Sequence, residues 1–204
     1  KIELQNGAFD VEILPDAFEM HPMYRTQHIF KDLDIKKIEK SQTGLCVTMM
    51  YSEKYLDCYN LQLKIIDCIV PDALAVLDFC SEKILSGKWV ALAAKSAVPP
   101  SPRYIYTGQA VSEGDSVWLH SHGLNRCGIT ELEILNSTKD TYNTHYEIIE
   151  SFASRLLDAT ELPQEKEPFF LARLTNEVYL VVTLVPWKEA IGFFENVSVG
   201  GFPD

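Results

Sequence analysis

The spacing of apolar residues changes several times along the first half of the chain, and each change predicts a new element. The run 45–51 is rich in apolar side chains and predicts a strand. Beyond it, apolar residues recur at every third or fourth position until Pro71, which predicts an amphipathic helix that ends there. The run 73–79 is continuously apolar, as in a strand covered on both faces, except for Asp78, which must find a hydrogen-bond partner or a helix N-terminus. A second helix is predicted at 88–96.

The second half of the chain repeats this order of strand, amphipathic helix and apolar strand. The predicted elements are strands at 104–111, 117–122 and 131–134, a helix at 142–158, and a hairpin formed by 169–174 and 178–185. The run 178–185 lacks the polar alternation of a solvent-facing strand. We therefore expect it to be an interior strand of the sheet.

These patterns predict an α+β fold with a mixed, largely antiparallel sheet and helices packed on it. Two pseudo-repeated β-α-β halves are one arrangement that the pattern allows. Three prolines within 99–102 indicate a rigid connection. We divide the chain into an N-terminal extension at 1–43, a first α+β half at 44–97 and a second half at 98–204, packed as one compact unit. The first residue is Lys and the last residues form no tail, so we expect a piece of a longer protein, truncated at its C-terminus.

Composition and charge exclude several classes of partner. The chain has 204 residues, of which 47% are hydrophobic and 23% charged, enough to bury a core. Its net charge of −11 would repel phosphate backbones and anionic lipid, so we expect neither nucleic acid nor a membrane as partner. No apolar run approaches the roughly 20 residues of a membrane helix. The five cysteines are scattered without a C-x-x-C pair, which predicts reduced thiols in a cytoplasmic protein.

The stretch 117–135 concentrates the residues most able to carry chemistry. His120 and His122 are two positions apart on a predicted strand, so their imidazoles share a face and could converge on one metal ion. The candidates for the remaining ligands are Cys127, Glu131 or Glu133, and His145. The alternative is a polar–aromatic face in which Trp118 lies beside two hydrogen-bonded histidine rings. Because no complete metal-binding motif is present, we favour this alternative and expect no metal and no other cofactor.

A cysteine nucleophile is the second catalytic hypothesis. Cys127, with His120 or His122 as its base, would supply the residue types of a Cys–His hydrolase. Arg126 beside the thiol would help to lower its pKa. No nucleotide-binding or serine-hydrolase motif occurs in the sequence. His21 and His28 lie apart from this stretch, and we expect both to be surface or packing residues.

The absence of a complete catalytic motif favours a non-catalytic binding or scaffold module of a larger protein, with a protein or a small molecule as its partner. Aromatic residues expected at the surface would form a contact area: Tyr104, Tyr106, Trp118 and Trp187. The alternative function is a metal-dependent or Cys–His hydrolase-like enzyme centred on His120, His122 and Cys127.

The segment W-L-H-S-H-G-L-N-R-C-G, followed by E-L-E-I-L, resembles a family of cytosolic domains of unknown function from Gram-positive bacteria. The segments V-P-P-S-P, I-V-P-D-A-L-A-V-L-D-F and L-S-G-K-W extend the similarity over roughly 45–187. Members resemble one another in continuing beyond the point where this chain ends. The resemblance therefore implies a shared fold and a longer parent protein, and it implies no activity, cofactor or catalytic residue.

Overall fold

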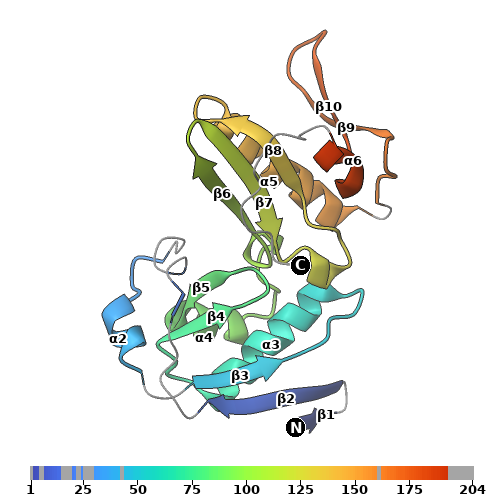
Figure 1. Cartoon of the computed structure of the whole chain (residues 1–204). Helices are drawn as coiled ribbons and strands as arrows, with labels where there is room; N and C mark the ends of the chain where they lie inside the picture. The colour runs from blue at the N-terminus through green and yellow to red at the C-terminus, as the bar shows by residue number, and fades with distance from the viewer. Residues whose placement is uncertain are drawn as a thin grey trace. The chain divides into compact units, whose positions relative to one another are not determined.

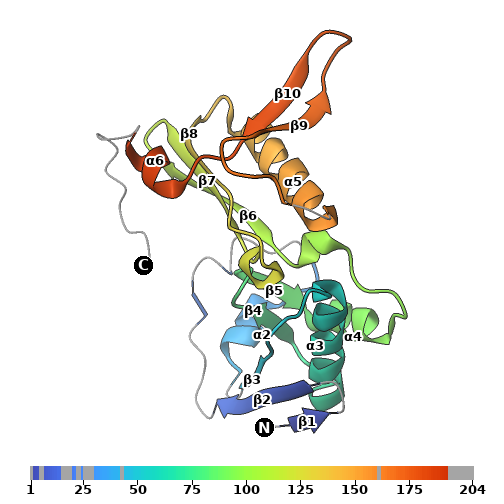
Figure 2. The same ribbon diagram turned by 90° about the vertical axis from the view of Figure 1, so that its right-hand side faces the viewer.

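Strands and helices alternate along the chain in the computed structural model, as the changes of period predict (Figures 1 and 2). The residues that it describes are 2–4, 7–14, 20–21, 24, 30–41, 44–159 and 162–192; His28 lies outside them. Every strand pairing within these ranges is antiparallel. The chain divides into two units, Lys1–Leu157 and Asp158–Asp204.

The first sheet joins the start of the chain to the first predicted strand. Its three strands are, in spatial order, β1 (Ile2–Leu4), β2 (Gly7–Leu14) and β3 (Gly44–Thr48). β2 and β3 pair from Asp10 opposite Thr48 to Leu14 opposite Gly44. Residues 1–43 thus contribute two strands to the fold, as well as the short helix α2 (Ile35–Glu39).

α3 (Tyr55–Ile69) follows β3 and is the helix predicted to end before Pro71. Its spacing of four places Tyr59 and Leu63 on one face, and they are 2% and 1% exposed. This face belongs to the main hydrophobic cluster, whose other buried members are Leu85, Val90 and Ile105. The amphipathic pattern of the sequence is therefore the pattern by which α3 packs.

A two-stranded hairpin leads directly into the next helix. Its elements are β4 (Ala75–Asp78), β5 (Lys83–Ser86) and α4 (Gly87–Lys95). The side-chain oxygen of Ser86 accepts a hydrogen bond from the Trp89 N–H at 3.4 Å, which caps α4. Position 87 requires glycine, because a Cβ there would lie 1.7 Å from the Ala73 carbonyl oxygen. This close approach brings α4 beside α3, and the two helices lie side by side (Figures 1 and 2).

The second three-stranded sheet contains the stretch with the two histidines. Its strands are β6 (Thr107–Glu113), β7 (Ser116–His122) and β8 (Glu133–Thr138), in that spatial order, with α5 (Tyr142–Asp158) next along the chain. Short 3-10 helices precede β6 at Pro102–Tyr104 and follow β7 at Asn125–Cys127. α5 covers one face of this sheet, where Val117 and Leu119 pack with Ile149 (Figures 1 and 2).

The second unit contains a two-stranded hairpin and a short helix. Its elements are β9 (Pro168–Arg173), β10 (Tyr179–Thr183) and α6 (Trp187–Gly192). The hairpin is as predicted, but β10 is not an interior strand: within the described ranges it pairs with β9 alone, and Tyr179 and Val181 are 54% and 49% exposed. The prediction is wrong because an apolar run describes the side chains of a strand and not the number of strands that pair with it.

The α+β fold class is confirmed, and so is the repeated order of strand, helix and strand at β3-α3-β4 and β8-α5-β9. The strands on either side of each helix belong to different sheets, so no β-α-β unit with paired strands forms in the part of the chain that is described. The two units divide after Leu157. The proposed halves at 44–97 and 98–204 stay a prediction.

Candidate functional site

β7 places three aromatic rings on one face, as its alternation predicts. The rings of Trp118 and His120 stack with their centroids 4.1 Å apart, and those of His120 and His122 meet edge to face at 4.4 Å. Trp118 Nε1 donates a hydrogen bond to Glu133 Oε2 at 3.0 Å. His122 Nε2 lies 3.4 Å from Glu82 Oε2. This is the ring arrangement of the polar–aromatic interpretation.

His120 is held by ring packing more than by hydrogen bonds. It is 8% exposed, and its Nε2 has no hydrogen-bond partner. Burial and the neighbouring His122 lower the pKa of His120 to about 4, so its ring is neutral at pH 7. The hydrogen bond that the polar–aromatic interpretation expects is therefore missing at Nε2.

Of the other proposed metal ligands, Glu133 lies opposite His120 on β8 and accepts the hydrogen bond from Trp118, whereas Glu131 and His145 have other partners. Glu131 accepts hydrogen bonds from Ser121 Oγ at 2.6 Å and from the Gly123 N–H at 2.7 Å. Ser121 alternates with the histidines along β7, so it lies on the opposite face of the strand. His145 Nδ1 lies 2.8 Å from Ser137 Oγ. Within the described ranges, no three His, Cys, Asp or Glu side chains are grouped as metal ligands would be.

Cys127 is not activated as a thiolate. Its side chain packs against the main hydrophobic cluster. Burial raises the pKa of its thiol to about 11 and outweighs the opposite effect of Arg126, so the thiol is protonated at neutral pH. All five cysteines are free of disulfide bonds, as the sequence predicts.

Arg126, on the loop between β7 and β8, forms a buried ion pair with Asp78 at the end of β4. Its Nη1 and Nη2 donate to Asp78 Oδ1 and Oδ2 at 3.1 and 2.7 Å, and both side chains are 10% exposed. Nη2 also donates to the Ile105 carbonyl oxygen. The guanidinium carbon lies 5.6 Å from the ring centroid of Tyr51 and 5.3 Å from that of Tyr59. Asp78 thus has the partner that its apolar surroundings require, although the sequence did not indicate which residue it would be.

One donor of this arginine stays free. Arg126 Nε is buried and has no hydrogen-bond partner. Burial alone would lower the pKa of Arg126, but the Asp78 carboxylate raises it above its ordinary value, so the guanidinium stays charged. A buried N–H donor without an acceptor costs free energy, and a bound acceptor would recover it.

Arg126 and Asp78 also line a cavity of about 540 Å³. Its walls are every residue of β3, every residue of β4 and one side of α3, to which Tyr59, Leu63 and Ile66 belong. We call it the strand-edge cavity. Most of its lining is apolar, with a few polar groups among the apolar ones, which is the usual form of a ligand site.

Gln62 supplies polar contacts in the lining of the strand-edge cavity. Its Nε2 donates to the Val47 carbonyl oxygen at 3.1 Å, and its Oε1 accepts a hydrogen bond from the Tyr51 hydroxyl at 2.7 Å. Burial raises the pKa of Tyr51 and of Tyr59 above the ordinary value, so both phenols stay protonated. The polar lining near β3 therefore consists of neutral groups.

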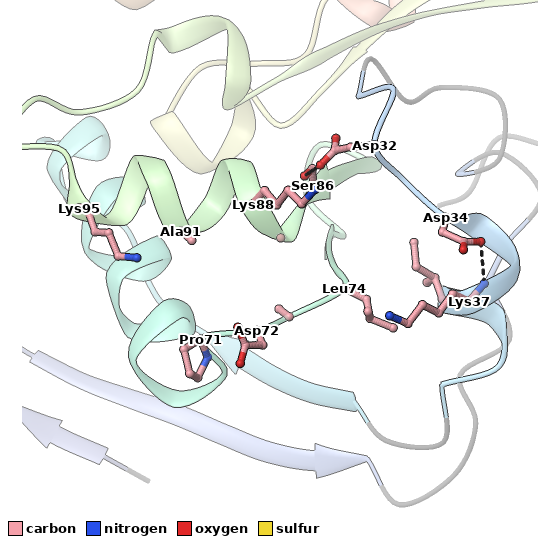
Figure 3. Close-up of a pocket in the computed structure, with 13 residues that line it drawn as sticks. Asp32, Asp34, Lys37, Pro71, Asp72, Leu74, Ser86, Lys88, Ala91 and Lys95 are labelled. Atoms are coloured by element: carbon pink, nitrogen blue, oxygen red, sulfur yellow. Dashed lines mark hydrogen bonds between the residues drawn. The ribbon is translucent and has the colours of Figure 1, made fainter.

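A second cavity, of about 520 Å³, is lined by α2, by α4 and by the segment that follows α3 (Figure 3). Its charged residues are balanced and all exposed: Asp32, Asp34, Asp72, Lys37, Lys88 and Lys95. Ser86 Oγ donates to Asp32 Oδ2 at 2.6 Å, and the Lys37 N–H donates to Asp34 Oδ1 at 3.1 Å. Exposed and balanced charges select no particular ligand, so the strand-edge cavity is the better candidate site.

The four aromatic residues expected at the surface differ in their exposure. Tyr106 is 3% exposed, and its hydroxyl donates to Glu150 Oε2 at 3.1 Å. Tyr104 packs on Trp89 with the ring centroids 4.5 Å apart. Trp187 begins α6 in the second unit. The expectation is wrong for Tyr106 because this residue precedes β6 instead of alternating along it, and its hydroxyl reaches Glu150 of α5.

Fold and site together define an α+β protein with an apolar cavity between two strands; within the described residues no helix is long and apolar enough to cross a membrane. Residues 1–100 match the N-terminal part, and residues 105–204 the C-terminal part, of a family described as "Protein of unknown function (DUF4026)". Because the two matches together span nearly the whole chain, the chain belongs to this family. Comparisons with curated proteins and with solved structures give no match. The resemblance to a family of unknown function is thus confirmed, and its cytosolic Gram-positive setting stays a prediction.

Proposed function

We propose that this chain is a non-catalytic binding module and that the strand-edge cavity is its ligand site. The observation that carries the proposal is a mainly apolar cavity of about 540 Å³ whose lining includes a buried arginine with an unpartnered Nε. The apolar walls would take up an apolar group, and the Nε–H would donate a hydrogen bond to an acceptor atom of the ligand.

Charge narrows the class of ligand. The guanidinium of Arg126 is balanced by Asp78, so the site has no spare positive charge for an anion. Asp72 adds a carboxylate to the lining, and the whole chain has a net charge of −11. The expected ligand is therefore neutral or positively charged. This agrees with the prediction from the sequence that nucleic acid is not a partner.

The neutral dye N-phenyl-1-naphthylamine, which fluoresces in apolar surroundings, tests the proposal. We expect saturable binding and slower alkylation of Cys46 and Cys80, whose residues line the cavity. Cys68 is exposed on α3 outside the lining, so its alkylation rate should not change. This cysteine is an internal control in the same molecule.

Two tryptophan substitutions supply a matched pair of variants. Leu45→Trp adds volume at the cavity wall, whereas Leu92→Trp adds it on α4, where Leu92 is 72% exposed and outside the lining. We expect the first to weaken dye binding by at least about tenfold, or roughly 1.4 kcal/mol, and the second to leave it unchanged. Equal affinities in both variants, or equal protection of Cys68, would overturn the proposal.

The alternative of a metal-dependent or Cys–His enzyme has a test of its own. Its residues are a neutral His120, a His122 that faces Glu82, and a protonated Cys127. One equivalent of zinc in protein purified without chelator, lost in His120→Ala, would favour the enzyme over the binding module.

A further inference from the structure

The strand-edge cavity is lined by two strands, each of which lies at the edge of its own sheet. β3 is the last strand of the sheet β1-β2-β3, and β4 is one edge of the pair β4-β5. All residues of both strands line the cavity, with the side of α3 that carries Leu63 and Ile66 between them. In the part of the chain that is described, no strand pairs with the outer edge of either one. A strand edge presents a row of N–H and C=O groups that can template the pairing of another strand.

The register of the β4–β5 hairpin shows which groups of β4 face outward. Ala75 lies opposite Ser86, and the Gly87 N–H donates to the Leu74 carbonyl at 3.4 Å. A bond between these flanking residues marks Ala75–Ser86 as a pair without hydrogen bonds of its own. The backbone groups of Ala75 therefore point away from β5, and by the same alternation so do those of Leu77.

A backbone carbonyl of β3 already accepts a hydrogen bond from a side-chain amide outside its sheet. The side-chain amide of Gln62, on α3, donates through Nε2 to the Val47 carbonyl at 3.1 Å. A neighbouring strand would place a backbone N–H against such a carbonyl. The Gln62 side chain thus stands where one peptide group of a further strand would stand, and Tyr51 holds its other end in place.

We propose that the strand-edge cavity binds an extended peptide segment of a partner protein, which pairs through its backbone with β3, with β4 or with both. This inference rests on the proposed binding function and names its ligand class. Alternate side chains of the segment would be apolar and would face Leu63 and Ile66 of α3. Lys or Arg at the ends of the segment would complement Asp72 in the lining and the net charge of −11.

The backbone chemistry favours a peptide over an apolar small molecule. Outward-facing N–H and C=O groups at Ala75 and Leu77 form a spaced row of donors and acceptors, which another polypeptide backbone matches. β3 has five residues and β4 has four, so each edge matches a segment of similar length. An apolar molecule would fill the volume and leave these groups unpaired.

The test starts from a library of acetylated and amidated octapeptides with Lys at both ends and Val, Ile, Leu, Phe or Tyr at alternate positions. The tightest binder, found by fluorescence anisotropy, is then made in two forms with N-methyl groups on one or the other alternate set of amides. The N–H groups of an extended segment alternate between its two edges, so each form loses pairing on one edge only. We expect at least one form to bind about tenfold or more weakly, which corresponds to about 1.4 kcal/mol.

Hydrogen exchange and one variant locate the pairing. Bound peptide should slow exchange at the amide of Leu77, whose N–H faces away from β5, and should leave that of Val76 unchanged. Ala75→Pro removes an outward-facing N–H at the first residue of a strand, where proline is tolerated. This variant should weaken peptide binding when β4 is the edge used, whereas Leu92→Trp, outside the lining of the cavity, should bind both the peptide and the neutral dye as the parent protein does.

The outcomes separate this inference from the proposed function. Dye binding without competition by any peptide of the library would overturn the peptide proposal and leave the binding module standing. If neither the dye nor any peptide binds to the protein, the proposed function itself is overturned. Equal affinities of the parent peptide and both methylated forms would show that the segment is held by its side chains alone, which also overturns backbone pairing.

Discussion

α3 and α5 occupy the same position in the chain order, each between two strands, yet strands cover them in different ways. α5 packs on a continuous sheet, where Val117 and Leu119 of β7 meet Ile149. α3 lies against β3 and β4, which belong to separate sheets, and a cavity of about 540 Å³ is left along this side of the helix. The interface between α5 and its sheet is thus filled by side chains, whereas the interface of α3 with β3 and β4 contains a cavity and is unfilled.

The difference shows that strands that stay in separate sheets leave a cavity beside the helix that packs on them. Both helices have apolar residues at helical spacing, so their own patterns do not distinguish them. Where three strands pair in one sheet, their side chains form a surface without gaps. Where two strand edges stay apart, the helix face between them lines a cavity. Arg126 and Asp78 are the polar part of that lining, and they connect the loop after β7 to the end of β4.

The largest effect is expected from removing the ion pair that connects the two regions. Arg126→Ala would leave the Asp78 carboxylate buried without its partner, so the free energy of unfolding should fall by about 3–5 kcal/mol. Urea denaturation measures this loss. The double variant Arg126→Leu with Asp78→Asn removes both charges and should recover part of it. A loss below about 1 kcal/mol in the single variant would show that the pair is solvated.

Two isoleucines compare the filled and the unfilled interface directly. Ile149 of α5 is 4% exposed, whereas Ile66 of α3 is half-buried and lines the cavity. Ile149→Ala should lower the free energy of unfolding by about 2–4 kcal/mol, because it creates a void in a packed interface. Ile66→Ala only enlarges an existing cavity, so we expect a loss of roughly 1 kcal/mol. Equal losses in urea denaturation would contradict the difference between the two interfaces.

The buried His120 of β7 should make the free energy of unfolding depend on pH. The pKa of His120 is lowered from 6.5 to about 4, so the unfolded chain takes up this proton at a higher pH than the folded one. Stability that is fully present above pH 6.5 is therefore lost as the pH falls toward 4, by about 1–3 kcal/mol. His120→Gln should lose less stability over the same interval, as measured by urea denaturation at several pH values. Parallel curves for the two proteins would show that His120 titrates normally.

The smallest effect on stability is expected at the surface of the sheet that α5 covers. Lys139 Nζ lies 3.6 Å from Asp115 Oδ1, and these side chains are 61% and 98% exposed. Lys139→Ala should change the free energy of unfolding by less than about 0.5 kcal/mol, because exposed ion pairs are screened by water and salt. Thermal unfolding at low and high salt checks this. A loss as large as that of Ile149→Ala would mean that charge, and not packing, stabilises the region.

Local patterns predicted most of the elements beyond residue 44 and the residues that share one face of β7. The helix at 142–158 has the predicted bounds, since a strong amphipathic pattern defines it. The period of two along β7 predicted that Trp118, His120 and His122 share a face. Such features depend on residues near one another in the chain, and local periodicity reports them.

The candidate site was out of reach of the same reasoning. Asp78 and Arg126 are 48 residues apart, and neither belongs to a motif that names the other. The sequence indicated that Asp78 needs a partner, and it offered Arg126 only as a neighbour of Cys127. The interior position expected for 178–185 failed for the same reason, because sheet neighbours are set by contacts across the chain.

The sequence by itself determined the α+β class, most of the strands and helices beyond residue 44, the apolar faces of α3 and α5 and the free thiols, but it did not indicate α2 or β5. Only the tertiary structure decided that β3 and β4 belong to separate sheets, that a cavity lies between them and that Arg126 reaches Asp78 there. The physical reason is that helix and strand periods are set by each residue and its near neighbours. Strand pairing and buried ion pairs are instead chosen among many distant partners by packing and desolvation.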